Sequence, residues 1–292
     1  MHMKTKKQVE RETLRGKAFY TEGHGFSSTV YPFPLEFTDK VICSDCMDVL
    51  KRIPDNSVDL ILTSPPYNFD REYEEYHDVI GWQSYFNKLF AVLDECIRIL
   101  KFGGRIVLNI QPVFSDYIPS HHIISHHMME QKMIWRGEIL WEKNNFNCNI
   151  YAFGSWKSPS CPYLKYTWEY LEIFSKGSIK HKGNSSCIDI TGDEFKNWVM
   201  AKWNIAPEMR QKSFGHPAMF PEALVERVLK LFSFQNDVVI DPFNGAGTTT
   251  LVAKRLNRRY LGIDISSVYC KTAERRIKEE EEAPCELKLW KE

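Results

Sequence analysis

The chain alternates short apolar runs with longer stretches in which apolar residues recur at helical spacing. The apolar runs predict strands at 41–43, 58–62, 105–110, 135–141, 238–240 and 260–263. The helical spacing predicts helices at 82–100, 117–131 and 221–234, another helix from Thr248, and a closing helix that contains the charged run 274–282. Strands that alternate with helices form mostly parallel sheets covered on both faces. The pattern therefore predicts an α/β fold with a mostly parallel, doubly wound sheet.

Two of these elements have distinctive patterns. Residues 58–62 are apolar on both faces, as expected of a central strand in a parallel sheet. The helix at 82–100 has a single apolar stripe, and we expect Gly103 and Gly104 to end it. The stripe consists of Tyr85, Leu89, Val92, Leu93, Cys96 and Leu100.

The regular pattern is lost between 144 and about 192. Asn, Ser, Pro, Gly and aromatic residues dominate this stretch, which contains one strand-like run at 170–174. We interpret 144–212 as an inserted recognition region in a single domain that spans 1–292, with 1–38 as an N-terminal extension. From 143 to 212 there are ten Lys and Arg against six Asp and Glu. This surplus favours a nucleic-acid partner only weakly, because an ordinary solvated surface would look the same.

Composition excludes several classes of protein. The chain has 292 residues, and no apolar run approaches the roughly 20 residues that span a bilayer. Residues 1–17 are basic and polar, so we expect no secretory signal, no membrane partner and a cytoplasmic location. The net charge of zero argues against a protein that coats nucleic acid through bulk charge. We interpret the eight cysteines, including the close pair Cys43 and Cys46, as buried thiols in a reducing compartment.

A glycine-rich turn follows the strand at 238–240 and opens the next helix. Its sequence, from Asp241 to Thr249, is DPFNGAGTT. Gly245 and Gly247 allow the backbone to approach a ligand at the carboxyl end of the strand, where open α/β sheets bind small molecules. Asp264 ends the next strand, at the position where an acid usually holds a ribose diol. The turn predicts a nucleotide site, although a purely structural turn would share these glycines.

A second motif, Ser64-Pro65-Pro66-Tyr67, lies at the end of the strand at 58–62. The two prolines stiffen the main chain and remove two backbone donors, which leaves carbonyl oxygens available as acceptors. Acceptors such as the Ser64 hydroxyl and the Pro65 carbonyl suit an exocyclic amine, and Tyr67 could stack on a base extracted from a duplex. The alternative, a polyproline ligand of an interaction module, requires an exposed disordered segment.

Together, and in this order, the two motifs resemble the amino-methyltransferase family of prokaryotic restriction-modification systems, in its permuted beta arrangement. The resemblance runs from about 41 to 273 and includes FGSWKSP at 153–159 and HPAMFP at 216–221. It implies a Rossmann-like methyltransferase fold with S-adenosylmethionine as cofactor. It also implies that Ser64, Pro65, Pro66 and Tyr67 form the catalytic tetrad.

The resemblance further implies a set of cofactor-binding residues. The glycine-rich turn would line the methionine and adenosine moieties, Asp264 would hold the ribose, Asp45 would contact the adenine, and 216–221 would close over the methionine end. The full set is Asp45, Thr63, His216, Pro217, Phe220, Asp241, Pro242, Phe243, Gly245, Gly247, Thr248, Thr249 and Asp264.

The target and partners follow from the same resemblance. Serine in the first tetrad position is similar to the cytosine-N4 enzymes, whereas Asp or Asn is commoner in adenine-N6 enzymes, which remain the alternative. The expected partner is double-stranded DNA with one flipped base, with a cognate restriction endonuclease and a homodimer both possible. Remoter alternatives are an RNA or protein methyltransferase and a non-catalytic nucleotide-binding module.

Residues in the inserted region are candidates for DNA contact, because basic and aromatic side chains alternate there. The alternative for its tryptophans is a local core. The candidates are Lys143, Asn144, Ser155, Trp156, Lys157 and Lys165. We expect no metal: the histidines of 121–127 have a zinc-like spacing but no third ligand, and a solvated helix face explains them.

Overall fold

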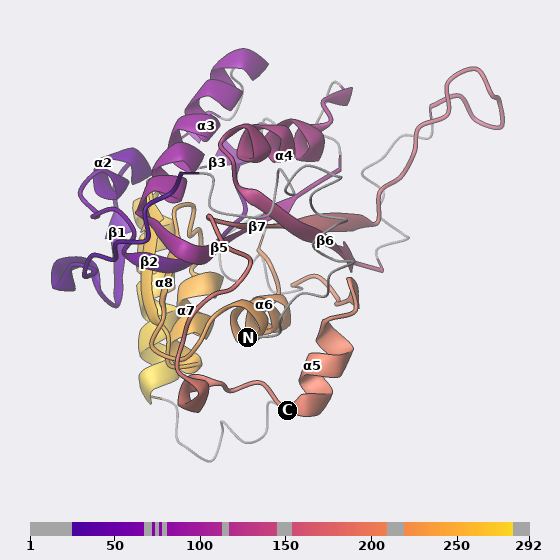
Figure 1. The fold of residues 1–292 in the computed structure, drawn as a ribbon. Coiled ribbons are helices and arrows are strands. Elements are labelled where there is room, and N and C mark those ends of the chain that lie inside the picture. Colours follow the sequence, from indigo (N-terminus) through magenta and orange to yellow (C-terminus); the bar gives the residue numbers. More distant parts are fainter. Residues whose placement is uncertain are drawn as a thin grey trace.

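A computed structural model describes residues 25–66, 72–73, 76–77, 81–112, 117–144, 154–208 and 219–282. Within this part, the chain forms an eight-stranded sheet in the order β1-β10-β9-β2-β5-β7-β6-β8 (Figure 1). A separate hairpin is formed by β3 (Glu72–Tyr73) and β4 (Tyr76–His77). The strands of the sheet are β1 (Lys40–Cys43), β2 (Val58–Thr63), β5 (Leu100–Ile110), β6 (Ile134–Glu142), β7 (Trp168–Ser175), β8 (Lys202–Asn204), β9 (Val238–Asp241) and β10 (Arg259–Asp264).

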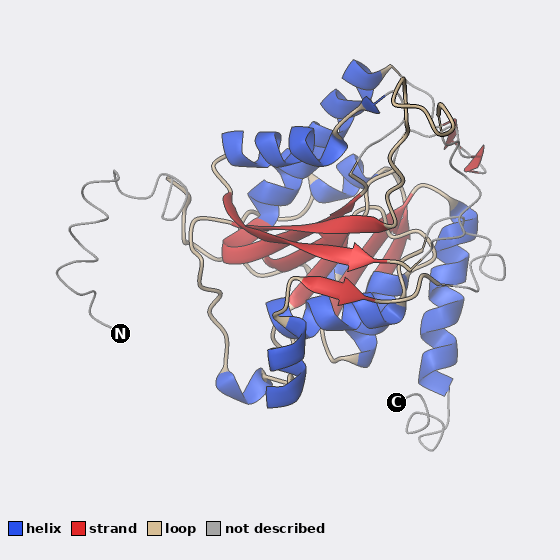
Figure 2. Ribbon diagram, turned by 90° about the vertical axis from the view of Figure 1, so that its right-hand side faces the viewer, coloured by secondary structure: helices blue, strands red, loops and turns tan. Residues whose placement is uncertain are grey.

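Helices cover both faces of this sheet (Figure 2). Strands β1, β10, β9, β2 and β5 are mutually parallel, whereas β7 is antiparallel to both β5 and β6. The predicted doubly wound α/β fold is therefore confirmed. The helices are α2 (Cys46–Leu50), α3 (Trp82–Ile99), α4 (Ser120–Glu130), α5 (Gly192–Trp198), α6 (Glu222–Phe232), α7 (Thr248–Arg255) and α8 (Ser267–Glu282), with short 3-10 turns η1 (Leu35–Phe37) and η3 (Ser185–Cys187).

Two apolar cores hold the layers together. One packs α3 and α4 against one face of the sheet, and the other packs α6 and α7 against the opposite face. Every residue of β2 is buried, as its two-sided apolar pattern predicted. Phe37, from the predicted N-terminal extension, is 2% exposed and belongs to the first core. Phe26 and Phe33 also contact this core, whereas residues 27–32 are exposed.

The glycine pair after α3 does not end the helix, so that expectation was wrong. Helix α3 ends at Ile99, and β5 begins at once with Leu100 and runs through both glycines. Gly103 has φ +86°, and a Cβ there would collide with the carbonyl of Lys180. A Cβ on Gly104 would lie 2.9 Å from the carbonyl of Asp59. These glycines permit close backbone approach inside a bulged strand.

Two segments of the range 144–212 belong to the main sheet. Strand β7 lies between β5 and β6, with Asn109 opposite Leu171, and β8 extends the sheet beyond β6. Between β6 and β7, the described loop from Gly154 onward extends away from the sheet (Figure 1). Periodicity could not show this, because strand pairing depends on contacts between distant segments.

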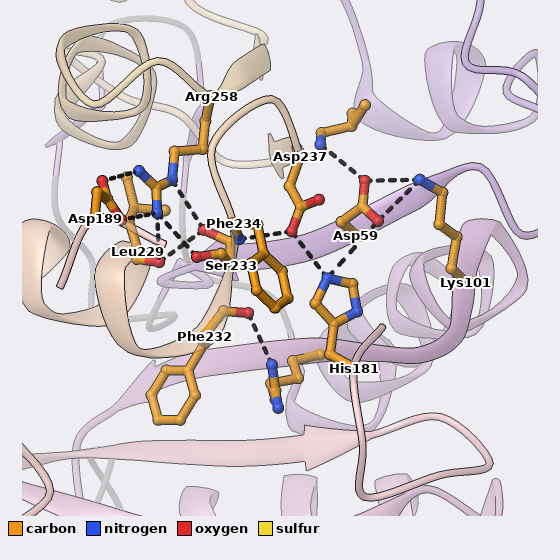
Figure 3. Close-up of polar contacts among 12 residues, drawn as sticks. Asp59, Lys101, His181, Asp189, Leu229, Phe232, Ser233, Phe234, Asp237 and Arg258 are labelled. Carbon is orange, nitrogen blue, oxygen red and sulfur yellow. Dashed lines mark hydrogen bonds and ion pairs between the residues drawn. The ribbon is translucent and has the colours of Figure 1, made fainter. Parts of the chain in front are cut away.

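A polar cluster links the amino ends of β2 and β9. The Lys101 ammonium lies 2.8 Å from both oxygens of Asp59, and His181 Nε2 lies 2.8 Å from Asp237 Oδ2 (Figure 3). Burial, followed by the nearby Asp237 carboxylate, raises the pKa of Asp59. Among the described residues, Asp59, His181 and Asp237 are the group whose ligand atoms could meet at one metal ion. Because Lys101 already neutralises Asp59, we interpret this group as a hydrogen-bonded ion cluster and not as a metal site.

Next to this cluster, Arg258 is fully buried and forms two hydrogen bonds with Asp189 (Figure 3). The same guanidinium donates to the carbonyl of Ser233 at 2.9 Å. Segment 176–191 is thus tied to the amino end of the sheet at both His181 and Asp189. No helix in the described ranges is long and apolar enough to cross a membrane.

Candidate active site

A cavity of about 450 Å³ opens at the carboxyl ends of four neighbouring parallel strands. Ser44 and Asp45 follow β1, the Ser64 turn follows β2, the glycine-rich turn follows β9, and Asp264 ends β10. Helix α3 contributes another wall. The carboxyl edge of such a sheet is the usual ligand site of the fold, and this volume suits a small molecule. Ser64 and Gly245 are 181 positions apart in the sequence, yet both line this cavity.

Asp241 joins the two turns from behind the cavity. Its carboxylate accepts the Thr63 hydroxyl at 2.6 Å and the Thr249 hydroxyl at 2.7 Å, and also the backbone N–H of Phe243 at 3.1 Å. Asp241 is 1% exposed, and its burial raises its pKa to about 6 although these three donors act in the opposite direction. The buried carboxylate therefore holds the end of β2 and the start of the glycine-rich turn in one arrangement.

The Ser64 turn is held by two further elements. Tyr85 of α3 donates its hydroxyl to the carbonyl of Pro66 at 2.5 Å. The Ser64 hydroxyl donates to the backbone carbonyl of Asn109 at 3.3 Å, and the Asn109 side-chain amide lies 3.4 Å from the same hydroxyl oxygen. The rigidity expected of two prolines is thus reinforced by hydrogen bonds from α3 and β5.

The glycine-rich turn presents its backbone to the cavity and is held in place by Asp264. Asp264 accepts the backbone N–H of Gly245 at 2.7 Å and that of Ser266 at 2.9 Å. Burial raises the pKa of Asp264 although both backbone donors oppose the shift. Asn244 is 5% exposed, and its amide nitrogen has no hydrogen-bond partner within the described part of the chain.

The first strand contributes an acid and a thiol. Asp45 caps α2, accepting the backbone N–H of Met47 at 2.8 Å, and its side chain is exposed at the cavity. Burial, assisted by Asp45, raises the pKa of Cys46 to about 12. That thiol stays neutral near pH 7 and contributes only wall surface. Neither Cys43 nor Cys46 forms a disulfide in the structure, but Cys43 and Cys161 are exposed, so the expectation of buried thiols was wrong for these two.

The structure brings together most, but not all, of the predicted cofactor residues. Four of them do not line the cavity and lie behind its wall: Thr63, Asp241, Gly247 and Thr249. Asp241 was expected to line the cavity but instead binds Thr63 and Thr249. Tyr67, His216 and Pro217 lie outside the described residues. The predicted residues that do line the cavity are Asp45, Ser64, Pro65, Pro66, Phe220, Pro242, Phe243, Gly245, Thr248 and Asp264.

Sequence reasoning missed several lining residues. Tyr85 was assigned only to an apolar helix stripe, although a hydroxyl on that stripe signals a polar partner. Lys88 is an exposed cation at the cavity, and Tyr269 closes it from α8. Asn244 occupies the variable position of the glycine-rich turn, where nothing in the pattern indicated a role.

The candidate DNA-contact residues fall into two groups. Lys143 is ion-paired with the buried Glu169, and Asn144 donates its side-chain amide to Asn204, so both are engaged at the end of β6. Trp156 is 67% exposed, and the Lys157 ammonium lies 5.6 Å from the centre of its ring. An antiparallel bridge between Gly154 and Pro162 closes the loop that contains Ser155, and Lys165 follows this bridge on the way to β7.

The comparison with known families identifies the chain. The N6/N4 methyltransferase family model, described as DNA methylase, matches residues 58–275. The chain belongs to this DNA methylase family. The matched segment starts with β2 and ends within α8, and it therefore contains both turns of the cavity.

Individual relatives extend the comparison of this DNA methylase. It is 29% identical to the Type II methyltransferase M.HpaI of Haemophilus parainfluenzae, over 82% of this chain and 74% of that protein. It is 31% identical to the Type II methyltransferase M.BglII of Bacillus subtilis, over 81% of this chain and 68% of that protein.

Solved structures share its fold. A Thermus thermophilus protein, described as a DNA modification methylase and solved in complex with S-adenosyl-L-methionine, aligns with a TM-score of 0.67 and 26% identity. That alignment covers 82% of this chain and 93% of the other. The cytosine-N4-specific PvuII DNA methyltransferase aligns with a TM-score of 0.59, over 81% and 85% of the two chains. At 20% identity, the PvuII enzyme supports the fold alone.

Proposed function

We propose that this DNA methylase is the modification enzyme of a restriction-modification system. It transfers a methyl group from S-adenosylmethionine to the exocyclic N4 amine of cytosine in duplex DNA. The single observation that carries the proposal is the shared cavity, in which Ser64 and Gly245 face the same space. Type II methyltransferases among the relatives and the cofactor complex of a structural neighbour support it.

The cavity fits the cofactor in its donor set. The Asp264 carboxylate can accept ribose hydroxyls, and the Asp45 carboxylate can accept an adenine amine. Phe243 and Tyr269 offer aromatic surface for an adenine ring. When bound, the cofactor supplies an electrophilic methyl group on a sulfonium.

The chain's own residues act on the target amine. The Ser64 hydroxyl oxygen and the Pro65 carbonyl can each accept one hydrogen of an exocyclic NH₂, which directs the nitrogen lone pair out of the ring. Prolines at 65 and 66, together with the hydrogen bond from Tyr85, keep these acceptors fixed. Direct transfer then requires positioning and exclusion of water, and the amine proton is lost afterwards. Tyr67 is proposed to stack on the flipped base.

The preference for cytosine rests on Ser64. A serine hydroxyl stands where the adenine-N6 enzymes that this family also contains more often have Asp or Asn. Adenine N6 is the alternative target, because the same acceptor pair would suit either amine.

Asp264→Asn should weaken cofactor binding. One acceptor oxygen becomes a donor, and hydrogen bonds to charged groups contribute about 1.5–3 kcal/mol, so Kd should rise about 10- to 100-fold. The measurement is equilibrium binding of S-adenosylmethionine to the purified protein. Asp48→Asn is the control, because Asp48 is exposed on α2 and does not line the cavity. An unchanged Kd for Asp264→Asn would remove Asp264 from the cofactor site.

Lys157→Ala should weaken DNA binding through a lost phosphate contact. We propose that the exposed loop containing Trp156, Lys157 and Lys165 contacts DNA, with Ser155 shaping it. Loss of one phosphate contact should reduce the slope of log K against log salt by about 1. Duplex binding would be measured across a salt series, with Lys196→Ala on the exposed face of α5 as control. Equal slopes for the two variants would show that Lys157 makes no phosphate contact.

Nucleoside analysis tests the whole proposal. Unmethylated genomic DNA is incubated with the protein and cofactor labelled in its methyl group, then digested to nucleosides that are separated and identified by mass. The expected product is labelled N4-methylcytosine. N6-methyladenine alone would select the alternative target, and absence of any labelled nucleoside would reject the proposed activity.

A further inference from the structure

A buried carboxylate stands behind the Ser64 turn on a strand from the predicted recognition region. Glu169 of β7 is 4% exposed, and Asn109 of β5 is 2% exposed. Because Asn109 pairs with Leu171 across the two strands, Glu169 lies diagonally opposite Asn109 on the same face of the sheet. The Asn109 side-chain amide donates to Glu169 Oε2 at 2.5 Å.

The second oxygen of Glu169 is also engaged. Lys143 donates its ammonium to Oε1, and Gln111 donates its side-chain amide to Oε1 at 3.3 Å. The Lys143 ammonium lies 4.7 Å from the ring centre of Trp141, which faces Glu169 across the β6–β7 pair. Donors on both carboxylate oxygens fix the orientation of Glu169, and Glu169 in turn fixes which way the Asn109 amide points.

Asn109 in turn sets the direction of the Ser64 hydroxyl hydrogen. The hydroxyl hydrogen is directed to the Asn109 backbone carbonyl at 3.3 Å, and the Asn109 amide nitrogen approaches the hydroxyl oxygen at 3.4 Å. A hydroxyl has one hydrogen and two lone pairs. With its hydrogen directed toward Asn109, the hydroxyl meets a ligand in the cavity as an acceptor and not as a donor.

We infer that Glu169 is a positioning residue for catalysis, which acts through Asn109 to present the Ser64 hydroxyl as a hydrogen-bond acceptor. The inference rests on the proposed role of Ser64 toward the target amine. It also changes the role proposed for Lys143. Lys143 neutralises Glu169, so its loss should affect kcat more than DNA affinity.

The test compares two variants of similar length, of which only one carries an oxygen acceptor for Asn109. Glu169→Gln and Glu169→Met are each combined with Lys143→Met, because removal of both members of a buried ion pair is tolerated better than removal of one. The Gln side chain retains an oxygen that can accept the Asn109 amide, whereas Met cannot. We expect kcat of the Gln double variant to exceed that of the Met double variant on the order of 10- to 100-fold, because small misplacements cost factors of this size.

Further readouts separate positioning from stability and from the proposed function. KM for S-adenosylmethionine should match between the two double variants. The Met double variant should unfold at a lower midpoint because the buried Asn109 amide loses its acceptor, so rates are compared well below both midpoints. In a Ser64→Ala background, single-turnover rates of the two should become equal, since their difference acts through Ser64. Asn109→Ala provides a second route: it should lower kcat, and the loss should not add to that of Ser64→Ala.

Several outcomes would overturn the inference. Equal kcat for the two double variants would show that Asn109 needs no acceptor, and an undiminished difference in the Ser64→Ala background would show that it acts elsewhere. Full activity of Asn109→Ala would show that the Asn109 side chain does not position Ser64. If Ser64→Ala alone keeps near wild-type turnover, the proposed function of Ser64 fails first, and that result is visible independently of the Glu169 variants.

Discussion

Ser64→Ala should lower kcat about 100- to 1,000-fold, the usual cost of removing one preorganised polar group that acts on the reacting centre. The hydroxyl lines the cavity beside the glycine-rich turn, and its proton is directed to Asn109. Its loss leaves one hydrogen of the target amine without an acceptor. The measurement is turnover of labelled methyl groups onto duplex DNA at saturating cofactor.

Two comparisons define the specificity of this effect. KM for S-adenosylmethionine should change little, because Ser64 is assigned to the target amine. Ser186→Ala is the matched control, since Ser186 is exposed in η3. Near wild-type turnover of Ser64→Ala would refute the assignment of this turn to catalysis.

Asp241→Asn should remove a pH dependence of folding stability. Burial raises the pKa of Asp241 to about 6, above its ordinary value of 3.8, so the folded state binds this proton more tightly than the unfolded chain. The resulting stability is fully present below pH 3.8 and is lost as the pH rises through about 6. The rise of the Asp241 pKa from 3.8 to about 6 corresponds to about 3 kcal/mol.

The measurement is urea unfolding of both proteins from about pH 4 to about pH 7. The free energy of unfolding of wild type relative to Asp241→Asn should fall by about 3 kcal/mol across this range. Thr249→Val removes a hydrogen bond that favours the charged carboxylate, which raises the pKa of Asp241 further. The free energy of unfolding of this variant should therefore keep falling to a higher pH than that of wild type. Parallel pH curves for wild type and Asp241→Asn would contradict the account.

Much of the fold could be predicted because its elements have strong local patterns. The two-sided apolar run of β2 and the amphipathic stripe of α3 each determine their own structure, and both were found at nearly the right bounds. The glycines after α3 misled the prediction, because a glycine that ends a helix and one that admits a neighbouring backbone look alike in sequence. Gly103 serves the latter purpose next to Lys180.

The placement of β7 was unpredictable for a different reason. Its apolar residues indicated a strand, but whether that strand joins the main sheet depends on partners far away in the sequence. The same limit hid the route from Glu169 through Asn109 to Ser64, which spans three strands and no contiguous motif.

The candidate site could be predicted wherever a backbone requirement restricts the residue. Gly245 and Asp264 were found because they stand at strand ends in a motif. Asp241 belongs to the same motif, yet it lies behind the cavity and ties Thr63 to Thr249. A motif thus marks where a site forms, while the direction of each side chain is settled by packing.

The central claim is that the Ser64 turn and the glycine-rich turn serve one reaction in one cavity. A crystal structure of the protein with S-adenosylmethionine and a duplex bearing its target base tests this most directly. The account predicts the cofactor between Asp264 and the Gly245 turn, with its methyl group facing the Ser64 hydroxyl and a flipped base beyond it. A cofactor bound elsewhere, or a target base that does not approach Ser64, would contradict the account.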